Sequence, residues 1–119
     1  MFDQQRPFNR TDRVSDKVRH SISEVILKNP ILTKGLITIT KVTMSKDLRY
    51  AKVFFSHIDT GLDNSELEKK LNQNKSKIKY LMGLNLGAQY VPQINFYFDE
   101  KYAKSARIEN LLNKVKNNK

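Results

Sequence analysis

Five lysines between residues 69 and 79 form the densest group of chemically active side chains in the sequence. No acidic residue separates Lys69, Lys70, Lys75, Lys77 and Lys79. An ammonium group is a point charge with three hydrogen-bond donors, which suits the phosphates of a polyanion. The run therefore favours nucleic-acid binding, with a merely solvated basic surface as the alternative.

The residues that usually carry catalysis are sparse. His20 and His57 stand apart, with no nucleophile motif, no H-x-x-x-H pair and no glycine-rich phosphate loop beside them. The chain has no cysteine, which excludes disulfides, thiolate zinc sites and thiol nucleophiles. We therefore expect no catalytic residue, metal, cofactor or small-molecule substrate, and a function that consists of binding.

Length and charge indicate one small basic domain. The 119 residues include 22 Lys and Arg against 12 Asp and Glu, a net charge of +10 that is spread over the whole chain. Apolar runs are far shorter than the ~20 residues that cross a bilayer, and the polar start is unlike a signal peptide. We expect a monomeric cytoplasmic protein that does not bind membranes and whose partners are polyanions.

The first half of the chain predicts a helix and a hairpin. Val14, Val18 and Ile22 recur at helical spacing and predict a helix over about 12–28. Two alternating segments, about 36–44 and 49–57, predict a β-hairpin. The alternation changes phase near Thr40, which indicates a bulge.

The second half predicts a broken helix pair, a strand and a terminal helix. Ser65 and Glu68 have the spacing of a capping box, and the apolar stripe that follows is interrupted at Asn74 and Lys75. The lysines thus surround a predicted break. A strand over 94–98 and a terminal helix over about 105–115, after Ser105, complete the chain.

This order predicts an α+β fold, with a three-stranded sheet and helices on one face. Helix–strand–strand–helix–helix–strand is the order of a type II KH domain, which binds single-stranded nucleic acid and usually clamps the backbone with a G-x-x-G loop. No G-x-x-G occurs here. We divide the chain into a flexible basic arm (1–10), a KH-like RNA-binding domain (11–100) and a C-terminal helix and tail (101–119).

The ordered set of segments resembles the ribosome-binding factor A family over nearly the whole chain. The segments are RVSDKVR at 13–19, VTMSKDLRYAKVFFS at 42–56, VPQINFYFD at 91–99 and RIENLL at 107–112. The resemblance implies an assembly factor that binds the free 30S subunit, acts late on 16S rRNA whose 5′ end is being processed, and supports growth in the cold.

The resemblance also implies a type II KH-like fold whose helices meet at an Ala-x-Gly kink. Asn74-Lys75-Ser76 occupies those positions here. Since Asn and Ser side chains can hydrogen-bond the freed backbone, we expect the kink to persist.

Three basic groups are candidates for rRNA contact, and the kink group comes first. There, backbone amides opening the second half-helix form a predicted anion site, and Lys75 and Lys79, at i and i+4, are the favoured pair. The candidate residues are Lys69, Lys70, Asn74, Lys75, Ser76, Lys77 and Lys79 at the kink; Arg6, Arg10, Arg13 and Lys17 on the first helix and its leader; and Lys46 and Arg49 at the hairpin turn.

Aromatic residues on the strands add a further expectation. Tyr50, Phe54 and Tyr97 lie opposite the apparent core phase, where they are either stacking platforms for bases or covered by another element. Two other functions stay open at this point: a generic KH-like module for single-stranded nucleic acid, and a basic domain that binds an acidic protein.

Overall fold

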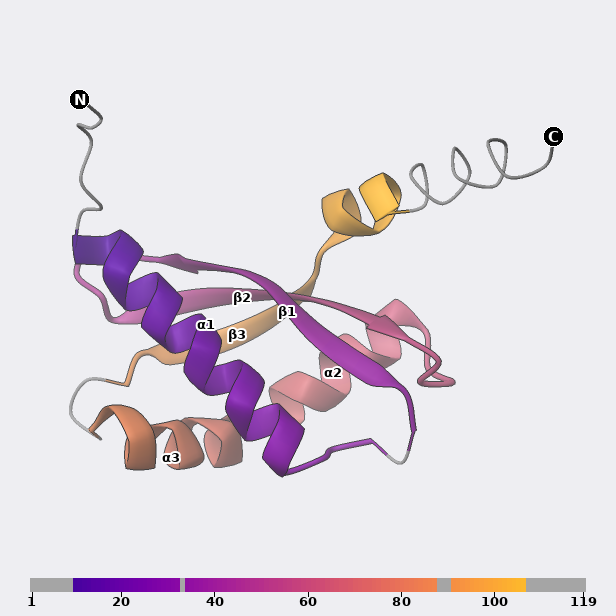
Figure 1. The fold of residues 1–119 in the computed structure, drawn as a ribbon, viewed down its shortest axis with the longest axis horizontal. Coiled ribbons are helices and arrows are strands. Elements are labelled where there is room, and N and C mark those ends of the chain that lie inside the picture. The colour runs from indigo at the N-terminus through magenta and orange to yellow at the C-terminus, as the bar shows by residue number, and fades with distance from the viewer. Residues whose placement is uncertain (1–9, 33, 88–90, 107–119) are drawn as a thin grey trace, which may run out of the picture.

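The computed structural model describes residues 10–32, 34–87 and 91–106. The elements in chain order are α1 (Arg10–Lys28), β1 (Leu36–Met44), β2 (Tyr50–Ile58), α2 (Asn64–Gln73), α3 (Lys75–Leu86) and β3 (Gln93–Phe98). A short helical segment, 100–106, follows β3. The sheet order is β1-β2-β3, with β1 antiparallel and β3 parallel to β2. The α2–α3 crossover makes this parallel pairing possible (Figure 1).

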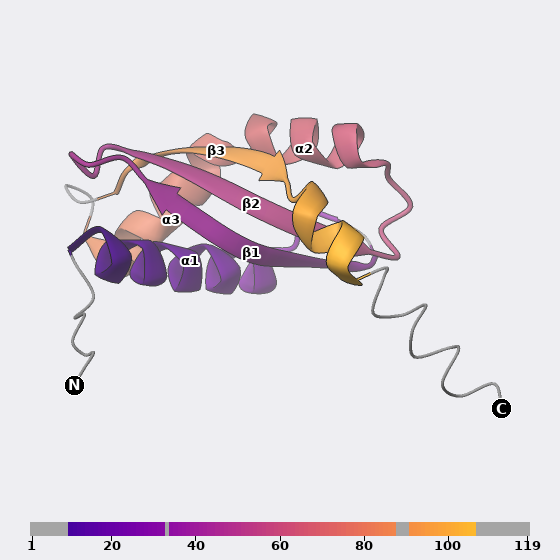
Figure 2. The ribbon, with the colours of Figure 1, turned by 90° about the horizontal axis from the view of Figure 1, so that it is seen from above.

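All three long helices bury their apolar side chains against one side of the sheet. From the helices, the core takes Val18, Ile22, Leu67, Leu71, Ile78 and Met82, and from the strands Val53, Phe55, Ile94 and Phe96. Figure 2 shows α1 beside β1 and α2 beside β3. The predicted α+β, type II KH-like fold is thus confirmed.

The bulge predicted near Thr40 is present. The β1–β2 register shifts between Ile39 and Lys41. The extra residue resets the alternation, so that Ile39 and Val42 both reach the core.

The free edge of β3 is closed by side chains of α2. Asn72 Oδ1 accepts the Phe96 N–H at 2.8 Å, and Asn72 Nδ2 donates to the Phe96 carbonyl at 3.0 Å. Glu68 Oε2 accepts the Phe98 N–H at 2.8 Å. An edge strand exposes unpaired backbone groups, and these contacts satisfy them much as a fourth strand would. They also fix α2 along β3.

Helix α2 begins two residues earlier than the capping prediction placed it. Asp63 is the N-cap: its Oδ1 accepts the Glu66 N–H at 2.8 Å, while Glu66 Oε1 accepts the Asp63 N–H at 3.0 Å. The predicted Ser65–Glu68 box was wrong, because Asp63 and Glu66 have the same three-residue spacing and it is this pair that forms the box. Glu68 is already engaged with β3.

The helical segment 100–106 begins two residues after the end of β3, so the predicted start at Ser105 was wrong. The rest of the predicted terminal helix, within residues 107–119, lies outside the described part of the chain. Asp99 caps segment 100–106, with Oδ1 accepting the Tyr102 N–H at 3.0 Å and Oδ2 accepting the hydroxyl of the bulge residue Thr40 at 2.6 Å. Partial burial opposes ionisation, but these hydrogen bonds outweigh it and hold the pKa of Asp99 below its usual value.

Replacing Asn72 tests whether α2 depends on its contact with β3. We expect Asn72→Ala to lower the free energy of unfolding by about 1–3 kcal/mol, because it leaves two half-buried backbone groups without partners. Asn72→Asp should cost at least as much, since its carboxylate faces the Phe96 carbonyl where an amide donor stood. Urea denaturation monitored by circular dichroism measures both.

Gln73→Ala, at the exposed neighbouring position, is the matched control and should change stability by no more than about 0.5 kcal/mol. An Asn72→Ala variant as stable as this control would contradict the role given to the contact.

Two glycines with nearly equal positive φ angles allow a paired test of packing between the ends of β1 and β2. Gly35 and Gly61 have φ of +81° and +79°. A Cβ at Gly35 would lie 2.6 Å from backbone atoms of Ile58 and Asp59, whereas one at Gly61 would meet only the flexible Lys34 side chain at 2.9 Å.

Both Ala variants carry the left-handed backbone penalty of about 1 kcal/mol. We expect Gly35→Ala to lose substantially more stability than Gly61→Ala, since backbone cannot move aside as a lysine can. Equal melting temperatures would show that the β1–β2 end is not tightly packed.

Candidate nucleic-acid interface

The helix break falls at Asn74, as the sequence predicted. Asn74 ends α2 and begins α3 with φ −100° and ψ 5°, and its backbone N–H contacts the carbonyls of Lys70 and Leu71. Its Nδ2 donates to the Lys70 carbonyl at 2.8 Å. The Asn74 side chain thus bonds a backbone carbonyl at the break, as expected for a kink without Ala-x-Gly, and it does so beside the helical bond that the same carbonyl accepts from the Asn74 N–H. The side-chain amide nitrogen is therefore used within the protein.

The break distributes the five lysines over different surfaces. Lys70 and Lys77 line a hollow of about 460 Å³ between the end of α1 and the α2–α3 junction, together with Asn74. Lys28 at the end of α1 lines the same hollow. Lysines from three helices thus line one hollow, an arrangement that suits a phosphate group. We call this the kink hollow.

The favoured pair, Lys75 and Lys79, does not line the kink hollow. Lys75 is half-buried, and its Nζ donates to Asn95 Oδ1 on β3 at 2.8 Å. Lys79 borders a separate hollow of about 260 Å³ with Tyr80. Lys69 and Ser76 are exposed outside both.

Lys28 was missed by the sequence reasoning because its proximity to Lys77 depends on α1 packing against α3. Lys70 and Lys77, by contrast, were already candidates, because they lie close to the predicted break in the sequence. Glu24 Oε2 lies 3.8 Å from Lys28 Nζ, an exposed pair that contributes little and leaves the lysine able to exchange partners.

The other two basic groups converge at the opposite end of α1. Lys17 of α1 and Arg49 of the hairpin turn line one groove of about 990 Å³. Arg13 is exposed one helical turn before Lys17, and Lys46 is exposed on the hairpin turn. Arg10 is the first residue of α1, and Arg6 lies outside the described residues. We call this the end groove.

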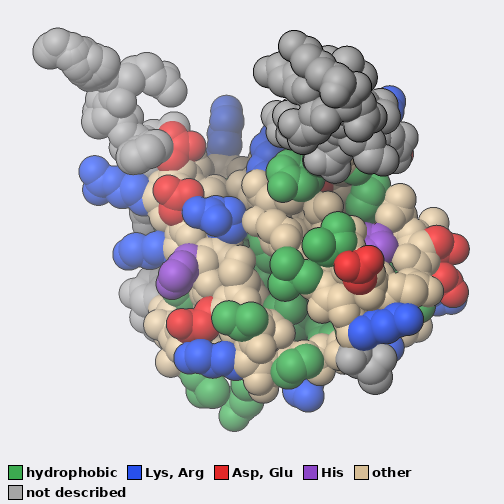
Figure 3. Space-filling view, turned by 45° about the vertical axis from the view of Figure 1, so that its right-hand side comes forward, with side chains coloured by type: hydrophobic (Ala, Val, Ile, Leu, Met, Phe, Trp, Pro, Cys, Tyr) green, Lys and Arg blue, Asp and Glu red, His purple; other side chains and the backbone are tan. Residues whose placement is uncertain are grey.

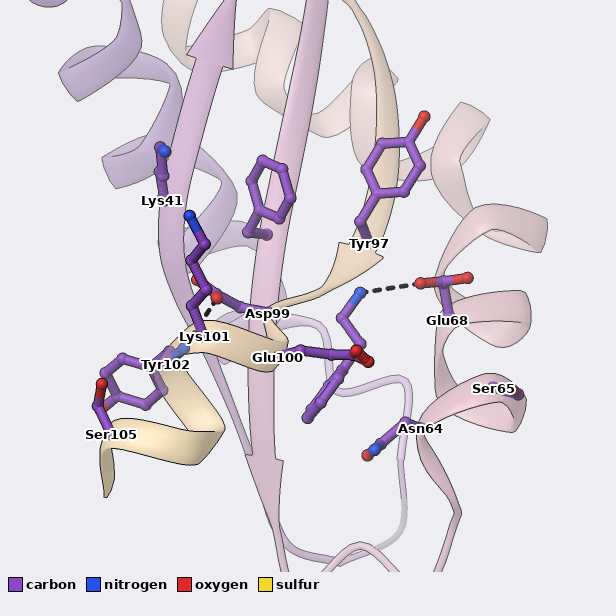
Figure 4. A pocket seen from close by; sticks show the side chains of 12 residues that line it. Lys41, Asn64, Ser65, Glu68, Tyr97, Asp99, Glu100, Lys101, Tyr102 and Ser105 are labelled. Carbon is purple, nitrogen blue, oxygen red and sulfur yellow. Dashed lines mark hydrogen bonds between the residues drawn. The ribbon is translucent and has the colours of Figure 1, made fainter. Parts of the chain in front are cut away.

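The outer face of the sheet carries the aromatic residues expected there. The rings of Phe54 and Tyr97 lie 5.8 Å apart at 35°, and Lys41 Nζ is 5.8 Å from the Phe54 ring centre. A hollow of about 920 Å³ adjoins them, between segment 100–106 and α2 (Figure 4). Glu68, Asp99 and Glu100 also line it, so it is less suited to phosphate than the other two.

Basic side chains elsewhere lie scattered among acidic and apolar ones, as Figure 3 shows for one face. Within the described residues, no group of three or more His, Asp or Glu is placed to hold a metal ion. His57 is engaged by Thr60 Oγ1 at 2.7 Å and Asn64 Oδ1 at 2.8 Å. None of the helices searched in the described part of the chain has the length and apolar character needed to cross a membrane.

Comparison with known proteins identifies relatives of both sequence and fold. The protein from Caldicellulosiruptor bescii named ribosome-binding factor A is 38% identical over 112 residues, covering 91% of this chain and 85% of that protein. The solution structure of a Thermotoga maritima protein is 30% identical with a TM-score of 0.64, covering 76% of this chain and 88% of that one.

A homology model of the Thermus thermophilus ribosome-binding factor A, fitted into a cryo-electron microscopy map of a 30S complex, is 17% identical to this chain. It gives a TM-score of 0.54, covers 68% of this chain and 86% of that one, and supports the fold. The family model described as ribosome-binding factor A matches residues 10–112. Because that match spans most of the chain, the protein belongs to the ribosome-binding factor A family.

Proposed function

We propose that this protein is a cytoplasmic, monomeric assembly factor that binds the free 30S ribosomal subunit and assists late maturation of 16S rRNA. We further propose that the protein assists 5′-end processing of that rRNA and contributes to growth in the cold. The protein acts by binding, without a cofactor or a catalytic residue of its own.

The observation that carries the proposal is the convergence of Lys28, Lys70 and Lys77 on the kink hollow. The break lies where KH domains clamp a nucleic-acid backbone. Further support comes from the relative from Thermus thermophilus, which has been fitted into the map of a 30S complex.

The chemistry of the hollow fits folded rRNA better than a base-reading site. Lysines deliver point charges to phosphate, whereas recognition of a base edge needs fixed, directional donors and acceptors. The polar side chains lining the hollow are three lysines and two asparagines, Asn29 and Asn74, and both amide nitrogens are bonded to backbone carbonyls. Binding at the kink should therefore follow backbone shape and depend strongly on salt.

Such binding assists maturation through population shift. A factor that fits an immature rRNA conformation better than the mature one favours the former while it is bound, and it dissociates when the mature structure no longer fits. This predicts co-sedimentation with free 30S subunits and little with 70S ribosomes. A sucrose gradient run at two salt concentrations measures both properties, and migration only with 70S ribosomes would contradict the proposal.

Neutralising the kink hollow should weaken 30S binding. We expect Lys70→Gln with Lys77→Gln to reduce the affinity for 30S subunits by about tenfold or more near physiological salt. The slope of log affinity against log salt should become shallower by about 0.7 to 0.9 for each phosphate that the variant no longer neutralises. Filter binding over a salt series measures affinity and slope together.

Two further pairs make the test specific. Lys101→Gln with Lys104→Gln removes the same charge from exposed positions on segment 100–106 and should change the slope little. Lys75→Gln with Lys79→Gln tests the pair that helical spacing favoured, and it should weaken binding less than the Lys70–Lys77 pair. A larger effect of the Lys75–Lys79 pair would move the phosphate contact away from the kink hollow.

A further inference from the structure

The end groove contains an aromatic ring, from Tyr50, and an arginine, neither of which the kink hollow has. Its volume of about 990 Å³ lies between α1, the hairpin turn, the end of α3 and the start of β3. Apolar walls come from Val14, Val18, Leu48, Leu86 and Val91, and the polar lining comes from Lys17, Asp47, Arg49, Tyr50, Asn85 and Gln93. A space with apolar walls, a few polar groups and cations can hold a small planar molecule.

The hairpin turn that forms one wall is held rigidly. Ser45 Oγ donates to Asp47 Oδ1 at 2.7 Å and accepts the Tyr50 N–H at 3.0 Å, while the Ser45 N–H donates to the Tyr50 carbonyl at 2.9 Å. The Gln93 N–H donates to the Arg49 carbonyl at 2.8 Å and joins the turn to β3. The wall therefore needs little ordering when a ligand binds.

Leu48 within this turn has a φ of +61°. A non-glycine residue in the left-handed region carries a conformational cost, and such positions concentrate at functional sites. Leu48 lines the groove, so the strained residue contributes directly to its apolar wall.

The charge and the aromatic ring in the groove suit a nucleotide. Tyr50 has 58% of its surface exposed. The acidic residue of the lining, Asp47, is already committed: the Ser45 hydroxyl and the Arg49 N–H lower its pKa, and Arg49 Nε lies 4.0 Å from it. Lys17 and Arg49 exceed this single negative charge. The Gln93 amide offers a donor and an acceptor suited to a base edge, whereas Asn85 Nδ2 already donates to Glu24 Oε1 at 3.4 Å.

We infer that the end groove binds one unpaired nucleotide of single-stranded RNA, with its base stacked on Tyr50 and its flanking phosphates beside Lys17 and Arg49. The inference rests on the proposed function, because it assigns a second contact with rRNA to the same protein. The end groove differs in chemistry from the kink hollow, because stacking on Tyr50 requires a base that is unpaired and lies outside an RNA helix.

An acidic peptide would also meet the two cations, but it would leave the exposed Tyr50 ring without a stacking partner. The Phe54–Tyr97 surface offers rings as well, yet in the hollow beside it three carboxylates outnumber two lysines, Lys41 and Lys101, whereas in the end groove the cations outnumber the single carboxylate. The end groove is therefore the stronger site for a nucleotide among the hollows of the described residues.

A fluorescent reporter tests stacking directly. The chain has no tryptophan, so Tyr50→Trp places a single indole at the groove. We expect quenching of its fluorescence on addition of 30S subunits, and also of a uridine decamer at higher concentration. A glutamate decamer should leave the signal unchanged, and quenching by that peptide equal to quenching by RNA would overturn the inference.

Affinity measurements separate stacking from charge. Tyr50→Ala should weaken decamer binding by about fivefold or more without changing its salt dependence, while Tyr50→Phe keeps the ring and should bind like the wild type. Lys17→Gln should make the salt slope shallower by about 0.7. Tyr102→Ala, at another exposed tyrosine on segment 100–106, is the control and should have no effect.

The failure of this inference and that of the proposed function are distinguishable. If the wild type binds 30S subunits but Tyr50→Ala binds subunit and decamer equally well, the groove is not a nucleotide site and the function stands. If the wild type does not bind 30S subunits but the decamer quenches the Tyr50→Trp variant, the groove binds RNA and the ribosomal assignment is wrong.

Discussion

The position of the kinked helix depends on two side chains that bond the free edge of β3, Asn72 and Glu68. Asn72 presents both an acceptor and a donor to the backbone of Phe96, so α2 lies along β3 in a single register. The break follows two residues later, at Asn74, and Lys75 is drawn to Asn95 on the same strand. The direction in which α3 leaves, and the lysines it presents to the end of α1, therefore follow from how α2 is held at the edge of the sheet.

The basic surface is built by packing as much as by composition. Five lysines occur within eleven residues, but only Lys70 and Lys77 of these line the kink hollow, and the third cation there comes from α1. The same lysines spread around a straight exposed helix would give a diffuse positive field and few simultaneous contacts. Convergence from three helices brings the lysines to one hollow, where the proposed phosphate contact combines general attraction with a defined position.

Local patterns were sufficient to predict the bulge at Thr40 and the break at Asn74, because each interrupts a periodic sequence at a single point. They were insufficient at the start of α2, where the Asp63–Glu66 and Ser65–Glu68 pairs have the same spacing. The capping box forms between Asp63 and Glu66, and Glu68 instead accepts the Phe98 N–H of β3. The convergence of Lys17 with Arg49 is tertiary. It requires the packing of α1 against β1 and the turn geometry, neither of which is encoded in spacing along the chain.

Helix α1 connects the two proposed RNA contacts. Lys17 lines the end groove and Lys28 lines the kink hollow, eleven residues apart on one uninterrupted helix, which corresponds to about 16 Å along its axis. Because the helix is packed against the sheet and α3, this separation is fixed before RNA binds. Engagement of one contact holds the rRNA at a defined distance from the other, and the second then forms at a high effective concentration. On this proposal, two contacts joined in this way would favour rRNA that presents a phosphate and an unpaired base at that spacing, and both would be lost together once folding removes the unpaired base.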